Sequence, residues 1–112
     1  MSRVPVKRYQ LMQRRFPELL KAVEHLGEVA AAAGPLDEKA KQLVQLAAAA
    51  AVRSEGAVHS HTRRALESGA SAEEIGHALV LLVSTIGFPN VVAALSWADD
   101  VLDRQRSEPQ LV

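Results

Sequence analysis

The side chains of this sequence that could do chemistry concentrate in one short segment, residues 54–62, which reads SEGAVHSHT. A histidine in this segment is suited to proton transfer, because both protonation states of an imidazole are populated near neutral pH. The neighbouring hydroxyl and carboxylate could orient such a ring or contact a substrate. This segment holds the only dense set of side chains that could do chemistry, namely Ser54, Glu55, His59, Ser60, His61 and Thr62.

Each of these residues also has a purely structural interpretation. Ser54 is more often a helix N-cap than a nucleophile, and no Gly-x-Ser-x-Gly elbow surrounds it. His61 could equally be a hydrogen-bonded core or interface residue. His59 lies two residues away, on nearly the opposite face of a helix, so the two histidines cannot share one metal ion. Glu55 and His59, four residues apart, are expected to pair as a surface contact. We predict neither a metal site nor a cofactor.

The composition excludes several classes of function. The 112 residues fit a single domain, 1–112, and contain 13 basic and 13 acidic side chains, so no strong positive field favours nucleic acid or a membrane surface. Cysteine is absent, which rules out disulfides, thiolate nucleophiles and cysteine-ligated zinc. The N-terminus has no apolar signal segment, and no apolar stretch approaches the ~20 residues of a membrane helix. We expect a cytoplasmic protein.

The apolar residues recur at three- and four-residue steps throughout, with no β alternation, so the predicted class is all-α. Residues 1–15 are expected to form an arm with a short helical start, and 105–112 a frayed tail. The clearest local signal is Ser71 followed by Glu74, a capping box. The predicted helices, bounded by glycine, proline or a capping side chain, cover about 17–33, 38–53, 55–68, 71–87 and 91–102.

Two of these helices contain segments that are apolar nearly all round, Ala47–Ala51 and Ala78–Val83. A helix that is apolar on every face must be covered on every face. A helical domain of this size has few other helices with which to cover two such segments. We therefore predict a homo-oligomer built through these helices; the alternative is a central core helix in a monomer.

The segment 54–79 resembles the signature of the carboxymuconolactone decarboxylase and alkylhydroperoxidase-D (AhpD)-like superfamily. In its redox members that signature is a Cys-x-x-Cys helix start, a histidine four residues later, and an acidic cap on the next helix. Here the histidine falls on His61, the cap is GASAEEI at 69–75, and a GFP corner follows at 87–89. The resemblance covers about 35–103. It implies an AhpD-like bundle of about five to six helices that assembles as a trimer or hexamer.

The departures from this signature bear directly on function. Ser54 and Ala57 stand where the resemblance places the two cysteines, and Gln42 stands where it places a proton-relay glutamate. Only His61 remains from that relay. Neither a hydroxyl nor a methyl group has an accessible disulfide state, so dithiol reduction of a hydroperoxide is chemically excluded at these positions. Gln42 could still hold His61 through a hydrogen bond.

The decarboxylase branch of the superfamily is thiol-free, and Glu55 and His61 match its pattern. The resemblance thus implies a cofactor-free lyase in which His61 is the general acid–base, positioned by Glu55, Ser54 or Gln42. A carboxylated substrate would also need a cationic group, for which Arg53, Arg63 and Arg64 are candidates. The alternative is a non-catalytic relative, a ligand-binding or structural homo-oligomer.

Overall fold

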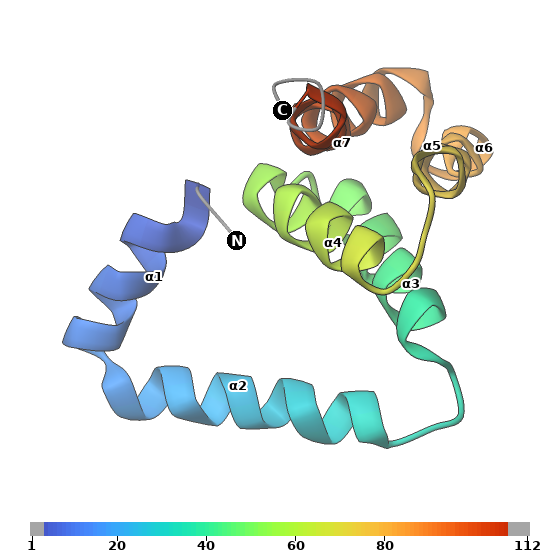
Figure 1. The fold of residues 1–112 in the computed structure, drawn as a ribbon. Coiled ribbons are helices and arrows are strands. Elements are labelled where there is room, and N and C mark those ends of the chain that lie inside the picture. Colours follow the sequence, from blue (N-terminus) through green and yellow to red (C-terminus); the bar gives the residue numbers. More distant parts are fainter. Residues whose placement is uncertain (1–3, 108–112) are drawn as a thin grey trace. The chain divides into compact units, whose positions relative to one another are not determined.

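The computed structural model describes residues 4–107, which form only α-helices, so the predicted all-α class is confirmed (Figure 1). The helices are α1 (Val4–Arg15), α2 (Pro17–Ala32), α3 (Glu38–Ala51), α4 (Glu55–Glu67), α5 (Ala72–Val80), α6 (Val83–Ile86) and α7 (Phe88–Ser107). By its contacts the chain divides into two compact units, Met1–Asp37 and Glu38–Val112. The single domain expected from the length stays a prediction. None of the described helices is long and apolar enough to cross a membrane.

The first unit consists of two helices that expose their apolar residues. Helix α1 is continuous to Arg15 and therefore longer than the short helical start expected for residues 1–15. Helix α2 begins with Pro17 in its first turn, where the missing N–H of proline breaks no hydrogen bond. Its predicted apolar stripe is formed, but no residue of α2 is buried. Four large residues of this stripe, Leu19, Val23, Leu26 and Val29, are each more than half exposed.

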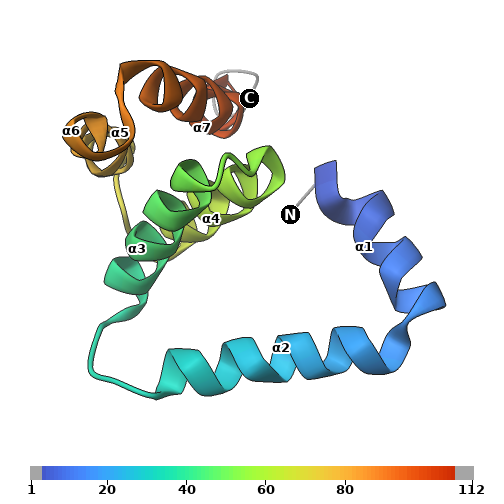
Figure 2. The ribbon, with the colours of Figure 1, turned by 180° about the vertical axis from the view of Figure 1, so that it is seen from behind.

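The second unit contains the core. Helices α3 and α4 form a hairpin and lie side by side in both views, and α7 packs on α4 (Figures 1 and 2). Four large apolar side chains, one each from α3 and α4 and two from α5, are completely buried: Leu46, Val58, Ile75 and Leu79. Each such side chain stabilises the fold by about 1.5–3 kcal/mol. Alanines such as Ala50, Ala94 and Ala98 allow the helices to approach closely.

Both ends of the loop between α4 and α5 follow the sequence pattern. Gly69 adopts a positive φ of 98° just after α4, a conformation that glycine accepts without strain. Ser71 then caps α5, and its hydroxyl accepts a hydrogen bond from the Glu74 N–H. The Glu74 carboxylate in turn accepts from the Ser71 N–H, so the predicted capping box is confirmed.

One predicted element is wrong in detail. The helix expected over 71–87 is interrupted after Val80, and α6 is a separate short helix. The N–H of Leu82 donates to the oxygen of Leu79, and that of Thr85 to the oxygen of Leu82, so the backbone tightens into three-residue turns at this point. Within the segment 78–83 only Leu79 is buried. Within one chain, this segment is therefore buried on one side only. The predicted homo-oligomer, which would cover the other sides, stays a prediction.

Candidate functional site

Helix α4 carries the candidate residues, and its start is fixed by Ser54. The Ser54 side chain accepts a hydrogen bond of 3.3 Å from the N–H of Ala57, and its backbone is extended, as an N-cap requires. The structural interpretation of Ser54 as a helix cap is confirmed. Just before it, Arg53 has a positive φ of 58°, which turns the chain between α3 and α4.

His61 lies on the side of α4 that faces α3. Its Nδ1 is 2.9 Å from Oε1 of Gln42, so the hydrogen bond expected between these residues is present. Because an amide oxygen can only accept, Nδ1 carries the proton and Nε2 keeps its lone pair. No described residue forms a hydrogen bond with Nε2. The ring is partly buried, so it is neither sealed in the core nor fully solvated.

The surroundings of His61 disfavour its charged form. Burial of the ring lowers its pKa below the ordinary value of 6.5, and the positive charges of Arg64 and Arg63 lower the pKa further. Desolvation and like charge both act against the imidazolium. At neutral pH the ring is therefore predominantly neutral, and its protonated form is a stronger acid than a solvent-exposed histidine.

The three candidate arginines are placed differently. Nη1 of Arg53 donates to Oδ1 of Asn90, whose own Nδ2 donates to the oxygen of Ile86 at 2.7 Å. This contact ties the turn before α4 to the first turn of α7. Arg63 and Arg64, in contrast, act electrostatically on His61. They are the cationic groups associated with the imidazole.

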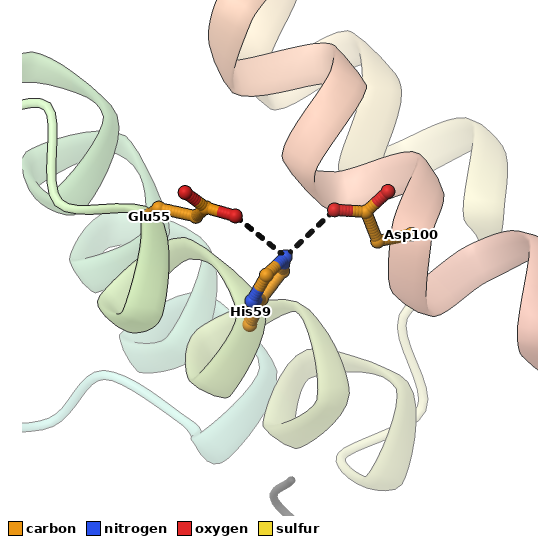
Figure 3. Close-up of side chains that lie close together, drawn as sticks. All are labelled: Glu55, His59 and Asp100. Carbon is orange, nitrogen blue, oxygen red and sulfur yellow. Dashed lines mark hydrogen bonds and ion pairs between the residues drawn. The ribbon is translucent and has the colours of Figure 1, made fainter. Parts of the chain in front are cut away.

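Glu55 lies on another side of α4, beside His59. Nε2 of His59 is 2.9 Å from Oδ2 of Asp100 and 4.0 Å from Oε2 of Glu55 (Figure 3). The expected pairing of Glu55 with His59 is present, but it is not a surface contact on both sides: His59 is only 7% exposed, and the carboxylates reach it from the surface. The structure therefore does not bring the predicted site residues together: His61 pairs with Gln42, Ser54 caps α4, and Glu55 lies beside His59 and Asp100.

The sequence does not identify Asp100 as a partner of His59. Asp100 lies on α7, 41 residues after His59, and nothing in its local sequence distinguishes it from the neighbouring Asp99. A more general signal was available, because a histidine on the apolar side of a helix needs a hydrogen-bond partner. Only the packing of α7 on α4 identifies that partner.

The comparisons with known proteins agree with this architecture. The model of the carboxymuconolactone decarboxylase family matches residues 17–100, which include α2 as well as α4, the helix that carries both His59 and His61. An uncharacterized protein of Methanocaldococcus jannaschii is 32% identical over 92 residues, covering 82% of this chain and 86% of its own length. The crystal structure of the apo form of a carboxymuconolactone decarboxylase family protein from Legionella pneumophila has a TM-score of 0.77 and 25% identity, covering 87% of each chain. The chain belongs to the carboxymuconolactone decarboxylase family.

Proposed function

We propose that the protein is a cofactor-free lyase that acts on a small carboxylated substrate, with His61 as the proton donor. The observation that carries this proposal is the His61–Gln42 pair, which holds the ring by Nδ1 and leaves Nε2 without a partner in the described chain. Membership of the family supports the reaction class. A histidine held in one orientation, with its second nitrogen available, is suited to general acid–base catalysis.

In the proposed reaction, the bond between a ring carbon of the substrate and its carboxylate breaks. The electron pair moves into the conjugated lactone as CO₂ leaves, and Nε2–H of protonated His61 gives its proton to the electron-rich carbon. The neutral ring then takes up a proton from water. Because the pKa of His61 is lowered, this proton is released more readily than from an ordinary imidazolium.

Arg63 and Arg64 fit the cationic part of this proposal. Their positive charges already act on the imidazole of His61. A substrate bearing carboxylates would be attracted to them, and its negative charge would offset their effect on the imidazolium. Binding of the substrate would thus favour the protonated, proton-donating form of His61.

The peroxidase activity of the redox relatives is not part of this proposal. Ser54 and Ala57 occupy the positions of the two thiols, and the Ser54 hydroxyl is engaged as the helix cap. Neither side chain can form a disulfide, so a hydroperoxide has no electron donor at this site.

The test is turnover of a carboxymuconolactone and related small carboxylated lactones, followed by CO₂ release. His61→Gln should lower kcat/KM by about a hundredfold or more, the range in which a positioned acid–base group contributes. His77→Gln, which changes an exposed histidine on α5, serves as the matched control and should leave turnover unchanged. Equal activity of His61→Gln and the wild type would remove His61 from the mechanism.

A second candidate is a ligand-binding protein without turnover. It is favoured by Gln42, because an amide can hold the imidazole but cannot relay a proton as a glutamate would. In that case, calorimetry would detect binding of a carboxylated lactone that Arg64→Gln weakens, while no CO₂ is released. Release of CO₂ by the wild type would exclude this candidate.

For either candidate we propose a homo-oligomer, a trimer or hexamer, built through the helices that carry Ala47–Ala51 and Ala78–Val83. The exposed apolar stripe of α2 extends the surface that we propose to pack on a second copy. Light scattering after gel filtration should give a multiple of the 12.1 kDa chain mass. Leu26→Glu, which places a charge in the stripe, should reduce the assembly, whereas Glu24→Gln should not. A monomeric wild type would contradict this proposal.

A further inference from the structure

We propose that Glu55, His59 and Asp100 form a binding site for a divalent first-row transition-metal ion such as Zn²⁺ (Figure 3). The site lies away from the His61–Gln42 pair and uses none of the residues that the proposed reaction requires. The metal-site proposal can therefore be tested independently of the lyase proposal. The sequence places only Glu55 and His59 together; the structure adds Asp100 from α7 as the third ligand.

The ligand atoms have the spacing that a metal ion needs. Nε2 of His59 and one oxygen of each carboxylate all lie within 4.8 Å of one another. Metal–ligand bonds of about 2.0–2.2 Å place tetrahedral ligands roughly 3.4 Å apart. The observed distances from Nε2, 2.9 Å to Asp100 and 4.0 Å to Glu55, lie on either side of that value. Small rotations of the two carboxylate side chains would complete the geometry.

The positions of the ligands on the helices favour a preorganised site. Glu55 and His59 are four residues apart on α4, so their side chains emerge on the same side of one helix. Asp100 approaches from α7, which packs against α4. Figure 3 shows both carboxylates converging on the same nitrogen of the ring. An ion at this point would join the two helices.

Burial and charge also suit a cation. His59 is only 7% exposed, so its ring is held by the surrounding packing, and Nε2 points to the two carboxylates. The carboxylate side chains are 55% and 56% exposed, which leaves a path for the ion and for water as a fourth ligand. Two carboxylates and a neutral imidazole supply two negative charges for a doubly charged ion. The imidazole favours zinc and its neighbours over magnesium and calcium, which prefer oxygen ligands alone.

The other nitrogen of the ring provides a second, independent observation. Nδ1 of His59 is buried and has no hydrogen-bond partner, and the same is true of Oγ1 of Thr62. These two residues are three positions apart and therefore lie on the same side of α4. A metal-bound imidazole carries its proton on the other nitrogen and donates it to a nearby acceptor. The Thr62 hydroxyl, which is buried on the same side of α4 and has no partner of its own, is the candidate for that acceptor.

The test is titration of the chelator-treated full chain with ZnCl₂ in a calorimeter. We expect saturable binding of one ion per chain and a rise of the melting temperature with the ion. Asp100→Asn and Glu55→Gln should each weaken binding by about tenfold or more, since even residues that only orient a ligand contribute tenfold or more. Both replaced carboxylates are exposed, so the variants should fold, which far-UV circular dichroism checks.

Two matched variants separate this site from other zinc-binding groups. Asp99→Asn changes the exposed neighbour of Asp100 on α7, and Glu67→Gln changes an exposed carboxylate at the end of α4. Both should bind zinc as the wild type does. The proposal is overturned if zinc shows no saturable binding, or if Asp100→Asn and Glu55→Gln bind it as tightly as these controls. The latter result would place the ion at an exposed histidine such as His25 or His77.

Discussion

Two histidines on α4, only two residues apart, are held in different ways. His61 faces α3 and is paired with the neutral amide of Gln42. His59 faces α7 and is paired with the carboxylate of Asp100, with a second carboxylate 4.0 Å away. His61 is partly buried beside two arginines, whereas His59 is almost completely buried with its acidic partners at the surface.

The difference shows how one helix can give the same side chain two properties. Beside a neutral partner and positive charges, the imidazole of His61 has a lowered pKa and gives up a proton readily. Beside carboxylates, the imidazole of His59 donates through Nε2–H to Asp100, and the same three groups form a ligand set for a cation. Because residues two apart on α4 point to nearly opposite sides of the helix, the two environments do not require different segments of the chain.

The largest effect on stability is expected when the Asp100 carboxylate, the hydrogen-bond partner of His59, is removed. In the metal-free protein, Asp100→Ala should lower the free energy of unfolding by about 1–3 kcal/mol, because a buried ring loses its hydrogen-bond partner. Urea denaturation measures this change. The matched variant Asp99→Ala should have little effect. A loss no greater than that of Asp99→Ala would mean that Asp100 does not stabilise the buried histidine.

Removal of Gln42, the hydrogen-bond partner of His61, should have a smaller effect on the free energy of unfolding. Gln42→Ala takes a neutral hydrogen bond from a ring that is only partly buried, so we expect a loss of about 1 kcal/mol or less. The same urea measurement applies. In a turnover assay, however, Gln42→Ala should lower activity more than Asp100→Ala does. A larger loss of activity in Asp100→Ala than in Gln42→Ala would mean that His61 is not the histidine that takes part in the reaction.

A charge change near His61 should shift its titration. Arg64→Gln removes a positive charge that lowers the pKa of His61, so the pKa should rise toward 6.5 in an NMR titration of the ring. If the imidazolium is the proton donor, activity should fall as the pH rises through this pKa. In the variant that fall should occur at a higher pH. An unchanged pKa would exclude electrostatic control by Arg64.

The same lowered pKa has a consequence for stability. Between the folded pKa of His61 and the unfolded value of 6.5, the unfolded chain binds more protons than the folded chain. The contribution of His61 to stability is therefore complete above pH 6.5 and declines as the pH falls below it. His61→Gln should reduce this decline in melting temperature between pH 7 and pH 5, by comparison with His77→Gln. An identical pH dependence in both variants would contradict the assignment.

Local signals in the sequence predicted the features that depend on neighbouring residues. The capping box of Ser71 and Glu74, the cap at Ser54 and the stripe of α2 follow from spacing alone. The Gln42–His61 hydrogen bond was an expectation from the resemblance, and the antiparallel packing of α3 on α4 accounts for it. The partnership of His59 with Asp100 depends on how α7 crosses α4, and no local pattern encodes that crossing. The interruption after Val80 has no proline or glycine to mark it.

The turn before α4 has a consequence for how this hairpin tolerates substitution. Arg53 is the one described residue other than glycine with a positive φ, a conformation that costs a side-chain-bearing residue about 1–3 kcal/mol. Its contact with Asn90 opposes that cost. A glycine here would relax the backbone but release the link to α7. A glycine substitution would therefore exchange a strained turn that is linked to α7 for a relaxed turn without that link, while α3 and α4 keep their contacts.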